Sequence, residues 1–249
     1  MLKGVFRRLE WHYRRGGVRQ VLWVCVSTPY YVVRYYPLRM WRTLAVQRRN
    51  LAFDRSYGVD TASPVKIGAL DVDGTSWLYG SGYEAVSDRD LFHILSLLPI
   101  EHSQYTFIDL GSGKGKALLL ASDYPFKRII GVEFSQKLHE VAVQNIARYR
   151  KDTQLCHDIH SVCADAMTYE LPDGSLVIFL ANPFGGEVMS VVVERLEALL
   201  LNAGQRKIFI AYLFPQNRAP FDRSPVFHEL ASSDRPAGGV VVYEGRYRG

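Results

Sequence analysis

The chain has 249 residues, of which 48% are hydrophobic and 22% are charged. This composition is ordinary for a soluble globular protein, and the length suits one α/β domain with appendages or a small pair of domains. Three cysteines at irregular spacing (Cys25, Cys156 and Cys163) argue against a disulfide framework and for a reducing compartment. We therefore expect a cytoplasmic protein.

Charge is divided unevenly along the chain. Residues 1–55 carry 12 Lys+Arg and 2 Asp+Glu, a net +10, whereas residues 56–249 carry 18 and 23, a net −5. We therefore expect a basic N-terminal extension over residues 1–55. A helical and loop lead-in over residues 56–104 and the main domain over residues 105–249 would follow it.

The N-terminal extension is also aromatic, with three of the four tryptophans. Its longest apolar stretch, residues 21–33, is too short to span a bilayer and contains Pro29. No clear small-residue cleavage site follows this stretch, which disfavours a signal peptide. Two interpretations remain. The extension is either a helical cap on the domain or an arm that binds an anionic membrane surface, making the protein peripheral, or nucleic acid.

The remaining elements are predicted from hydrophobic periodicity. Helical spacing over residues 88–98 predicts a helix that packs on a sheet, and from residue 105 onward strand and helix patterns alternate. Strands are expected at residues 105–110, 128–134, 160–166, 175–181 and 207–214. Helices are expected at residues 116–124, 136–150 (with Ser135 as N-cap) and 186–203.

This alternation predicts right-handed crossovers and a parallel sheet. Near the C-terminus, residues 224–232 and 238–246 are strand-like and flank a turn-rich segment, which indicates an antiparallel edge hairpin. The expected fold is therefore α/β, with a doubly wound, mostly parallel sheet of seven strands that closes with this hairpin, and with an N-terminal helical extension.

A glycine-rich turn, DLGSGKGK, follows the first strand and begins at Asp109. Gly111 and Gly113 let the backbone approach a ligand, because a side chain would block that approach. A P-loop needs Ser or Thr where Ala117 stands, and the dinucleotide fingerprint needs glycine where Lys116 stands. Both of those phosphate-binding motifs are therefore excluded.

Carboxylates end the first three strands. Asp109 ends the first, Glu133 ends the second at a spacing that suits the two hydroxyls of a ribose, and Asp165 ends the third at the expected adenine end. Such a row of acids would repel a pyrophosphate. It suits a ligand with a ribose and an amine but no phosphate, and S-adenosylmethionine is the natural candidate.

Over roughly residues 80–245 the sequence resembles the class I S-adenosylmethionine-dependent methyltransferases. The resemblance lies in the motif FIDLGSGKG, in Glu133 and Asp165, in the fourth-strand motif and in the closing hairpin. It extends to a group of largely uncharacterised bacterial methyltransferases whose fourth motif often reads Tyr-Asn-Pro-Phe, with Ala181 here in place of the tyrosine. The resemblance implies a methyltransferase that binds S-adenosylmethionine.

The fourth motif, ANPFGGEV, is similar to a segment of the non-SET histone-lysine methyltransferases (the telomeric-silencing disruptor family). It is also similar to the Asn/Asp-Pro-Pro-Phe/Tyr motif of the amino-directed DNA methyltransferases, without the second proline. Both families methylate nitrogen. We therefore expect Asn182 to accept hydrogen bonds from an amine, Pro183 to stiffen the turn, and Phe184 to stack on a planar base or face an alkylammonium. The alternative is an ordinary turn with Phe184 in the core.

The resemblance also implies a loop over the methionine end of the cofactor at residues 79–92. Tyr83 and Ser87 are its candidate contacts, although an ordinary loop fits the sequence equally well. A protein amine, above all lysine, is the first choice of methyl acceptor by analogy with the histone enzymes. A nucleobase is second, and a small molecule, a lipid or an inactive cofactor-binding module stays open.

Two motifs point elsewhere. LDVDGTS at residues 70–76 matches the haloacid-dehalogenase phosphatase motif, in which Asp71 would attack phosphorus, but the late acidic pair for Mg²⁺ is missing. Cys156, His157, His160 and Cys163 lie close together without paired zinc-ligand spacing, so no metal site is expected.

Overall fold

The computed structural model describes residues 43–65, 83–202, 206–233 and 239–246. Residues 43–57 are helical. Among the described helices, none combines the length and the apolar character that crossing a membrane requires.

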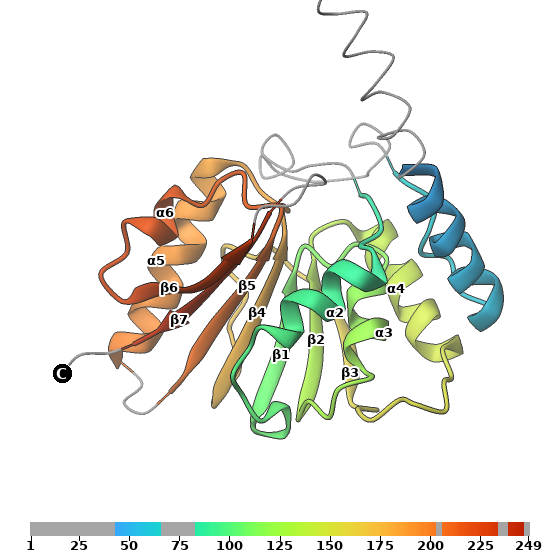
Figure 1. The fold of residues 1–249 in the computed structure, drawn as a ribbon, viewed down its shortest axis with the longest axis horizontal. Coiled ribbons are helices and arrows are strands. Elements are labelled where there is room, and N and C mark those ends of the chain that lie inside the picture. The colour runs from blue at the N-terminus through green and yellow to red at the C-terminus, as the bar shows by residue number, and fades with distance from the viewer. Residues whose placement is uncertain (1–42, 66–82, 203–205, 234–238, 247–249) are drawn as a thin grey trace, which may run out of the picture. The chain divides into compact units, whose positions relative to one another are not determined.

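A seven-stranded sheet carries the fold, with the strand order β3-β2-β1-β4-β5-β7-β6 (Figure 1). The pairs formed among β1 to β5 are parallel, whereas β7 pairs antiparallel with both β5 and β6. The strands are β1 (Tyr105–Leu110), β2 (Arg128–Glu133), β3 (Ile159–Cys163), β4 (Ser175–Ala181), β5 (Ile208–Leu213), β6 (Phe227–Ser233) and β7 (Val240–Gly245). The predicted class, a mostly parallel α/β sheet with a terminal antiparallel hairpin, is confirmed.

Helices cover both faces of the sheet (Figure 1). Buried side chains of α2 and α3 pack on one face, and those of α5 and α6 pack on the other. The helices are α2 (Asp88–Ser96), α3 (Lys116–Ala121), α4 (Gln136–Arg148), α5 (Gly186–Asn202) and α6 (Ala219–Asp222), with a 3-10 turn η3 (His102–Gln104) before β1. Because both faces are covered, the central strands are continuous apolar runs.

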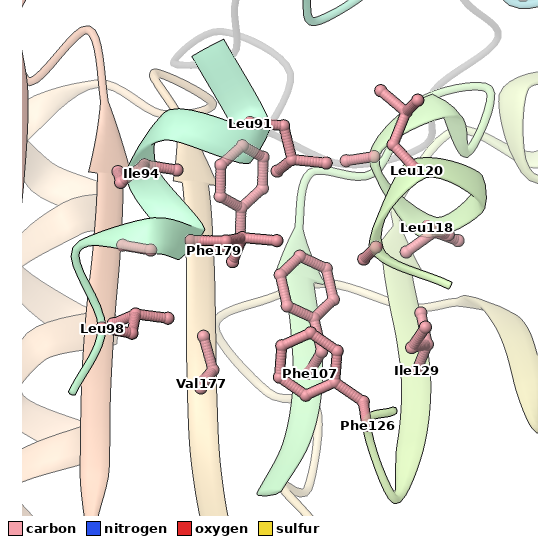
Figure 2. Close-up of a cluster of buried hydrophobic side chains, with 14 of the residues drawn as sticks. Leu91, Ile94, Leu98, Phe107, Leu118, Leu120, Phe126, Ile129, Val177 and Phe179 are labelled. Atoms are coloured by element: carbon pink, nitrogen blue, oxygen red, sulfur yellow. The ribbon is translucent and has the colours of Figure 1, made fainter. Parts of the chain in front are cut away.

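The core on the α2 and α3 side is built around two aromatic rings (Figure 2). Phe107 of β1 and Phe179 of β4 stack with ring centroids 5.8 Å apart, and Phe126 lies 5.2 Å from Phe107. Leucine and isoleucine side chains of α2 and α3 close over these rings. This layer fixes the two strands between which the candidate site lies.

Most element bounds agree with the sequence prediction to within two residues, and α3, β3 and β6 differ by three. β3 ends at Cys163 rather than Ala166, because the Asp165 side chain accepts the backbone N–H of Met167 at 2.8 Å and turns the chain out of the ladder. In the C-terminal hairpin β7 is the inner strand and β6 the edge strand. The short helix α6 was not predicted. Ser135 does cap α4, by accepting the N–H of Leu138.

The strand order reverses between β1 and β4, which are direct neighbours. The chain leaves β1 towards β2 on one side and leaves β4 towards β5 on the other. Such a switch point opens a crevice at the carboxyl ends of the two strands, where ligands bind in open α/β sheets. The glycine turn after β1 and the Asn-Pro-Phe segment after β4 therefore meet at this crevice.

Candidate functional site

Two adjoining pockets lie at the switch point. The larger spans about 650 Å³, open solvent included, and is lined by Asp109 and Glu133 among others, whereas the smaller spans about 340 Å³ on the same measure and is lined by Asp165. Gly111, Phe134 and Phe184 line both pockets. The structure therefore brings the three predicted acids to one continuous crevice.

Asp109 and Glu133 are both buried, at 3% exposure each. Burial, and secondarily the charge of Glu133, hold the pKa of Asp109 well above its ordinary value. Burial also raises the pKa of Glu133, although hydrogen bonds from backbone N–H groups oppose this shift. Two carboxyl groups whose ionised forms are disfavoured by burial are typical of a site that binds a positively charged ligand.

Glu133 also ties the glycine turn to the start of α4. Its Oε2 accepts the N–H of Gly113 at 2.7 Å, and its Oε1 accepts the N–H of Ser135 at 2.9 Å. An ionised carboxylate has about four acceptor positions, so it retains capacity for ligand hydroxyls.

The two glycines are required by neighbouring walls of the larger pocket. Gly111 has φ 88°, and a Cβ there would lie 2.5 Å from the Cβ of Pro183. Gly113 has φ 54°, and a Cβ there would lie 2.1 Å from Cδ2 of Tyr83. The absence of side chains thus lets Pro183 and Tyr83 close on the turn, in addition to any approach of the backbone to a ligand.

Asp165 lies in the smaller pocket with apolar neighbours that include Ala164, Ala166 and Val188. Apolar walls with one acid at the rim suit a flat heterocycle that carries an amino group.

The Asn-Pro-Phe segment reaches the crevice through two of its three residues. Pro183 and Phe184 line the larger pocket, as does Ala181, whereas Asn182 lines neither pocket and its Oδ1 is buried. Asn182 adopts φ 52°, a left-handed conformation that asparagine tolerates better than most residues. Its backbone conformation therefore places Pro183 and Phe184 in the wall.

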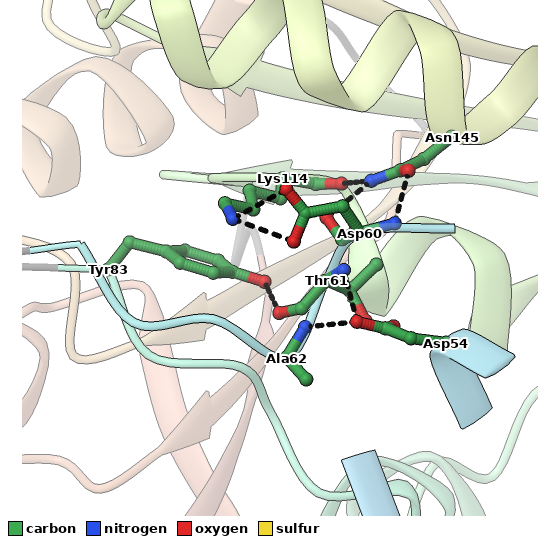
Figure 3. Close-up of polar contacts among 7 residues, drawn as sticks. All are labelled: Asp54, Asp60, Thr61, Ala62, Tyr83, Lys114 and Asn145. Carbon is green, nitrogen blue, oxygen red and sulfur yellow. Dashed lines mark hydrogen bonds and ion pairs between the residues drawn. The ribbon is translucent and has the colours of Figure 1, made fainter. Parts of the chain in front are cut away.

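Tyr83, predicted only as a loop contact, is a wall of the larger pocket and is anchored by the chain that precedes it (Figure 3). Its hydroxyl donates to the carbonyl of Thr61 at 2.7 Å. Asp54 in turn accepts the Thr61 N–H at 2.8 Å, the Thr61 hydroxyl at 2.6 Å and the Ala62 N–H at 2.7 Å.

A second set of bonds fastens the same segment to the glycine turn and to α4 (Figure 3). Asn145 accepts the Asp60 N–H at 2.8 Å and donates to the carbonyls of Asp60 and Lys114, both at 2.9 Å. Lys114 forms an ion pair with Asp60 at 2.9 Å. We call residues 54–62 the brace. It was not predicted, because its partners lie up to 85 residues away in the sequence.

The sequence analysis also missed two charged residues of the larger pocket, Glu84 and Lys116. Glu84 is exposed, whereas Lys116 is 2% exposed. In the sequence, Glu84 is marked only by following Tyr83, and Lys116 only by following the glycine turn. Among the described residues that line the two pockets, Lys116 is the only lysine or arginine, and none is a histidine.

Of the other predicted motifs, those within the described residues do not line this crevice. Ser87 is buried at the N-cap position of α2 and lines neither pocket. The phosphatase-like stretch at residues 70–76 lies outside the described residues. Cys156 is buried and Cys163 exposed, and within the described ranges no three His, Cys, Asp or Glu side chains are grouped to hold a metal.

The crevice fits S-adenosylmethionine by the chemistry of its donor set. Asp165 and the apolar smaller pocket suit adenine, Glu133 suits the ribose, and Asp109 suits the ammonium or sulfonium charge. The described lining residues include no group of cations that would hold a pyrophosphate.

Comparisons with known proteins bear on the same region. A family model described as "Putative methyltransferase" matches residues 103–181. A search of the curated proteins gives no match.

Similar solved structures include the 23S rRNA methyltransferase ErmE, at 16% identity and TM-score 0.44, covering 64% of this chain and 68% of that one. A ribosomal protein L11 methylase from Lactobacillus delbrueckii subsp. bulgaricus has 12% identity and TM-score 0.45, covering 64% and 78%. An RNA methyltransferase from Salinibacter ruber, in complex with S-adenosyl-L-homocysteine, has 15% identity and TM-score 0.41, covering 64% and 91%.

The family match covers β1 through β4, which carry the glycine turn and all three strand-end acids. Taken with the sheet order and the donor set of the crevice, this match supports a class I S-adenosylmethionine-dependent methyltransferase with S-adenosylmethionine as its cofactor.

Proposed function

We propose that this methyltransferase acts on nitrogen and that its acceptor is a protein amine, in the first place a lysine side chain. The observation that carries the proposal is the lining of the larger pocket. Ala181, Pro183 and Phe184 form one wall, carboxylates stand around it, and no described lining residue is a histidine. An amine suits this lining because it loses its proton to water and needs no side-chain base in the pocket.

Bound S-adenosylmethionine supplies an activated methyl group on its sulfonium. The protein holds the acceptor and the cofactor in the correct relative position. Methyl transfer needs the acceptor lone pair in line with the bond that breaks, so the acceptor must be held from several sides. Phe184 offers an aromatic face to an alkylammonium, and the exposed carboxylate of Glu84 attracts that cation to the mouth of the pocket. The turn at Asn182 sets the place of this wall.

The charge of the pocket favours an amine over a nucleic acid. Among the described lining residues, Glu84, Asp109 and Glu133 are acidic and only Lys116 is a lysine or arginine. Residues 56–249 carry a net −5. A phosphate backbone entering this pocket would be repelled, whereas a cationic side chain would be attracted.

The test is a transfer assay with the full chain and S-adenosylmethionine tritiated in the methyl group. A lysate is labelled and then separated into protein, nucleic acid, lipid and small-molecule fractions. We expect label in protein, recovered as N-methyl-lysine after hydrolysis, and none with Asp109→Asn. Label confined to nucleic acid, lipid or small molecules would refute the protein-amine proposal.

A further inference from the structure

Lys116, the first residue of α3, is a buried lysine in the wall of the larger pocket. Its Nζ donates a hydrogen bond to Oδ1 of Asn50 and stands 4.9 Å from the ring centroid of Phe53. In the part of the chain that the structure describes, no carboxylate forms an ion pair with it. Among the described residues, the Nζ atom therefore contacts a neutral amide and an aromatic face.

A buried ammonium without a counter-ion is costly. Desolvation accordingly lowers the pKa of Lys116 to about 8, although the charges of Asp54 and Asp88 act in the opposite direction. Lys114, two residues earlier, provides a contrast. It is also buried, but its Nζ contacts both oxygens of Asp60, at 2.9 and 3.0 Å. Among the described residues, one lysine of the glycine turn thus forms an ion pair and the other forms none.

The position of Lys116 along the crevice indicates which ligand group it meets. Asp165 lines only the smaller pocket, Gly111 lines both, and Lys116 lines only the larger one, together with Tyr83. Lys116 therefore lies at the end away from Asp165. If adenine lies beside Asp165, the amino-acid part of the cofactor extends towards Lys116.

The amino-acid part of S-adenosylmethionine is a zwitterion, so it needs both an anion and a cation in the pocket. Asp109 and Glu133 provide anions, and Lys116 is the only lysine or arginine among the described lining residues. We propose that the Lys116 ammonium binds the carboxylate of the methionine part of S-adenosylmethionine. This inference rests on the cofactor and is independent of the acceptor, so it stands or falls separately from the protein-amine proposal.

The experiment compares S-adenosylmethionine with decarboxylated S-adenosylmethionine, which keeps the adenosine, the sulfonium and the amine but lacks the carboxylate. Binding of each to the full chain is measured by isothermal titration calorimetry, without an acceptor. We expect the wild type to prefer the carboxylated form by about 10- to 100-fold, the range of a charge-assisted hydrogen bond. Lys116→Met should remove most of this preference by weakening only S-adenosylmethionine, whereas Lys116→Arg should keep it.

Lys114→Met is the matched control, because it removes a buried lysine of the same turn whose charge is already paired. It should retain the wild-type ratio between the two ligands. A wild type that binds both ligands equally, or fails to bind either, would overturn the proposal even if a variant does not fold. Equal weakening of both ligands in Lys116→Met would instead show a structural role and would also overturn it.

Discussion

Asp109 is a residue of the pocket whose ionised side chain lowers the stability of the folded protein and favours the binding of a cation. Its carboxylate is 3% exposed, and burial and the charge of Glu133 raise its pKa. The ionised form therefore destabilises the folded protein, and a cationic ligand that compensates this charge gains affinity by the same interaction.

We predict that Asp109→Asn stabilises the ligand-free protein and removes cofactor binding. The raised pKa means that the folded state binds this proton more readily than the unfolded state, so wild-type stability falls as the pH rises through the folded-state pKa. The thermal midpoint of the variant should exceed that of the wild type by about 2–4 °C at and above neutral pH, as ~1 kcal/mol gives in a chain of this size.

That difference should shrink as the pH is lowered towards the ordinary aspartate pKa, because the wild-type carboxyl then becomes neutral as well. Scanning calorimetry from pH 4 to pH 8, with and without S-adenosylmethionine, checks both parts. A variant that is less stable at every pH, or that still binds the cofactor, would contradict the assignment.

Asn182 is the second residue with a testable role. Because its φ is 52°, Asn182→Ala would strain the backbone by about 1–2 kcal/mol, whereas Asn182→Gly removes the side chain and keeps the conformation. We predict that Asn182→Ala lowers the rate of methyl transfer by about 100-fold, the cost of a misplaced acceptor, whereas Asn182→Gly keeps the rate close to that of the wild type. Both variants should leave cofactor affinity within several-fold. Transfer kinetics and calorimetry on the same sample measure the two effects. Wild-type turnover in Asn182→Ala, or an equal loss in Asn182→Gly, would refute a role through the backbone turn.

At the scale of elements, the brace connects three parts of the chain that form the pocket. Asp54 holds the carbonyl-bearing turn at Thr61, Thr61 anchors the Tyr83 hydroxyl, and Tyr83 packs on Gly113. Asn145 joins the brace to α4 through backbone hydrogen bonds. The pocket wall at Tyr83 thus depends on residues that never touch the ligand site.

We predict that Asp54→Ala weakens both the fold and the binding of S-adenosylmethionine. It leaves three hydrogen-bond donors without their acceptor, which costs about 1–3 kcal/mol, and it frees the anchor of Tyr83. The thermal midpoint should fall by several degrees, and the dissociation constant should rise by about five- to tenfold.

Asp123→Ala is the control for this variant. Asp123 interacts with Lys151 and Thr153 and lines neither pocket, so its loss should lower the thermal midpoint without changing the dissociation constant. If the two variants shift binding equally, the brace has no specific role in the site.

At the scale of the whole molecule, the N-terminal extension and the domain carry net charges of opposite sign. Residues 1–55 carry a net +10, whereas residues 56–249 carry a net −5. An extension that only capped the domain would not require so many arginines. We therefore favour the interpretation that it binds an anionic surface, either lipid headgroups or nucleic acid.

We predict that the full chain sediments with vesicles containing anionic lipid, or shifts nucleic acid in a gel, and that the binding weakens with salt. Replacing four arginines of the extension (Arg7, Arg8, Arg14 and Arg15) with glutamine should reduce the binding strongly, because each phosphate contact adds to affinity. Binding to neither surface at low salt would reject this interpretation.

The sequence alone determined the secondary structure of the sheet, the class of fold and the row of acids at the strand ends. These features depend on periodicity and on residues at strand ends, which local chemistry specifies. Only the tertiary structure decided that Tyr83 packs on Gly113, that Asn182 adopts a left-handed turn and lines neither pocket, and that Lys116 is buried with no ion-pair partner among the described residues. Each of these outcomes depends on contacts between distant segments, as in the bonds of Asn145 to Asp60 across 85 residues. No local pattern encodes them.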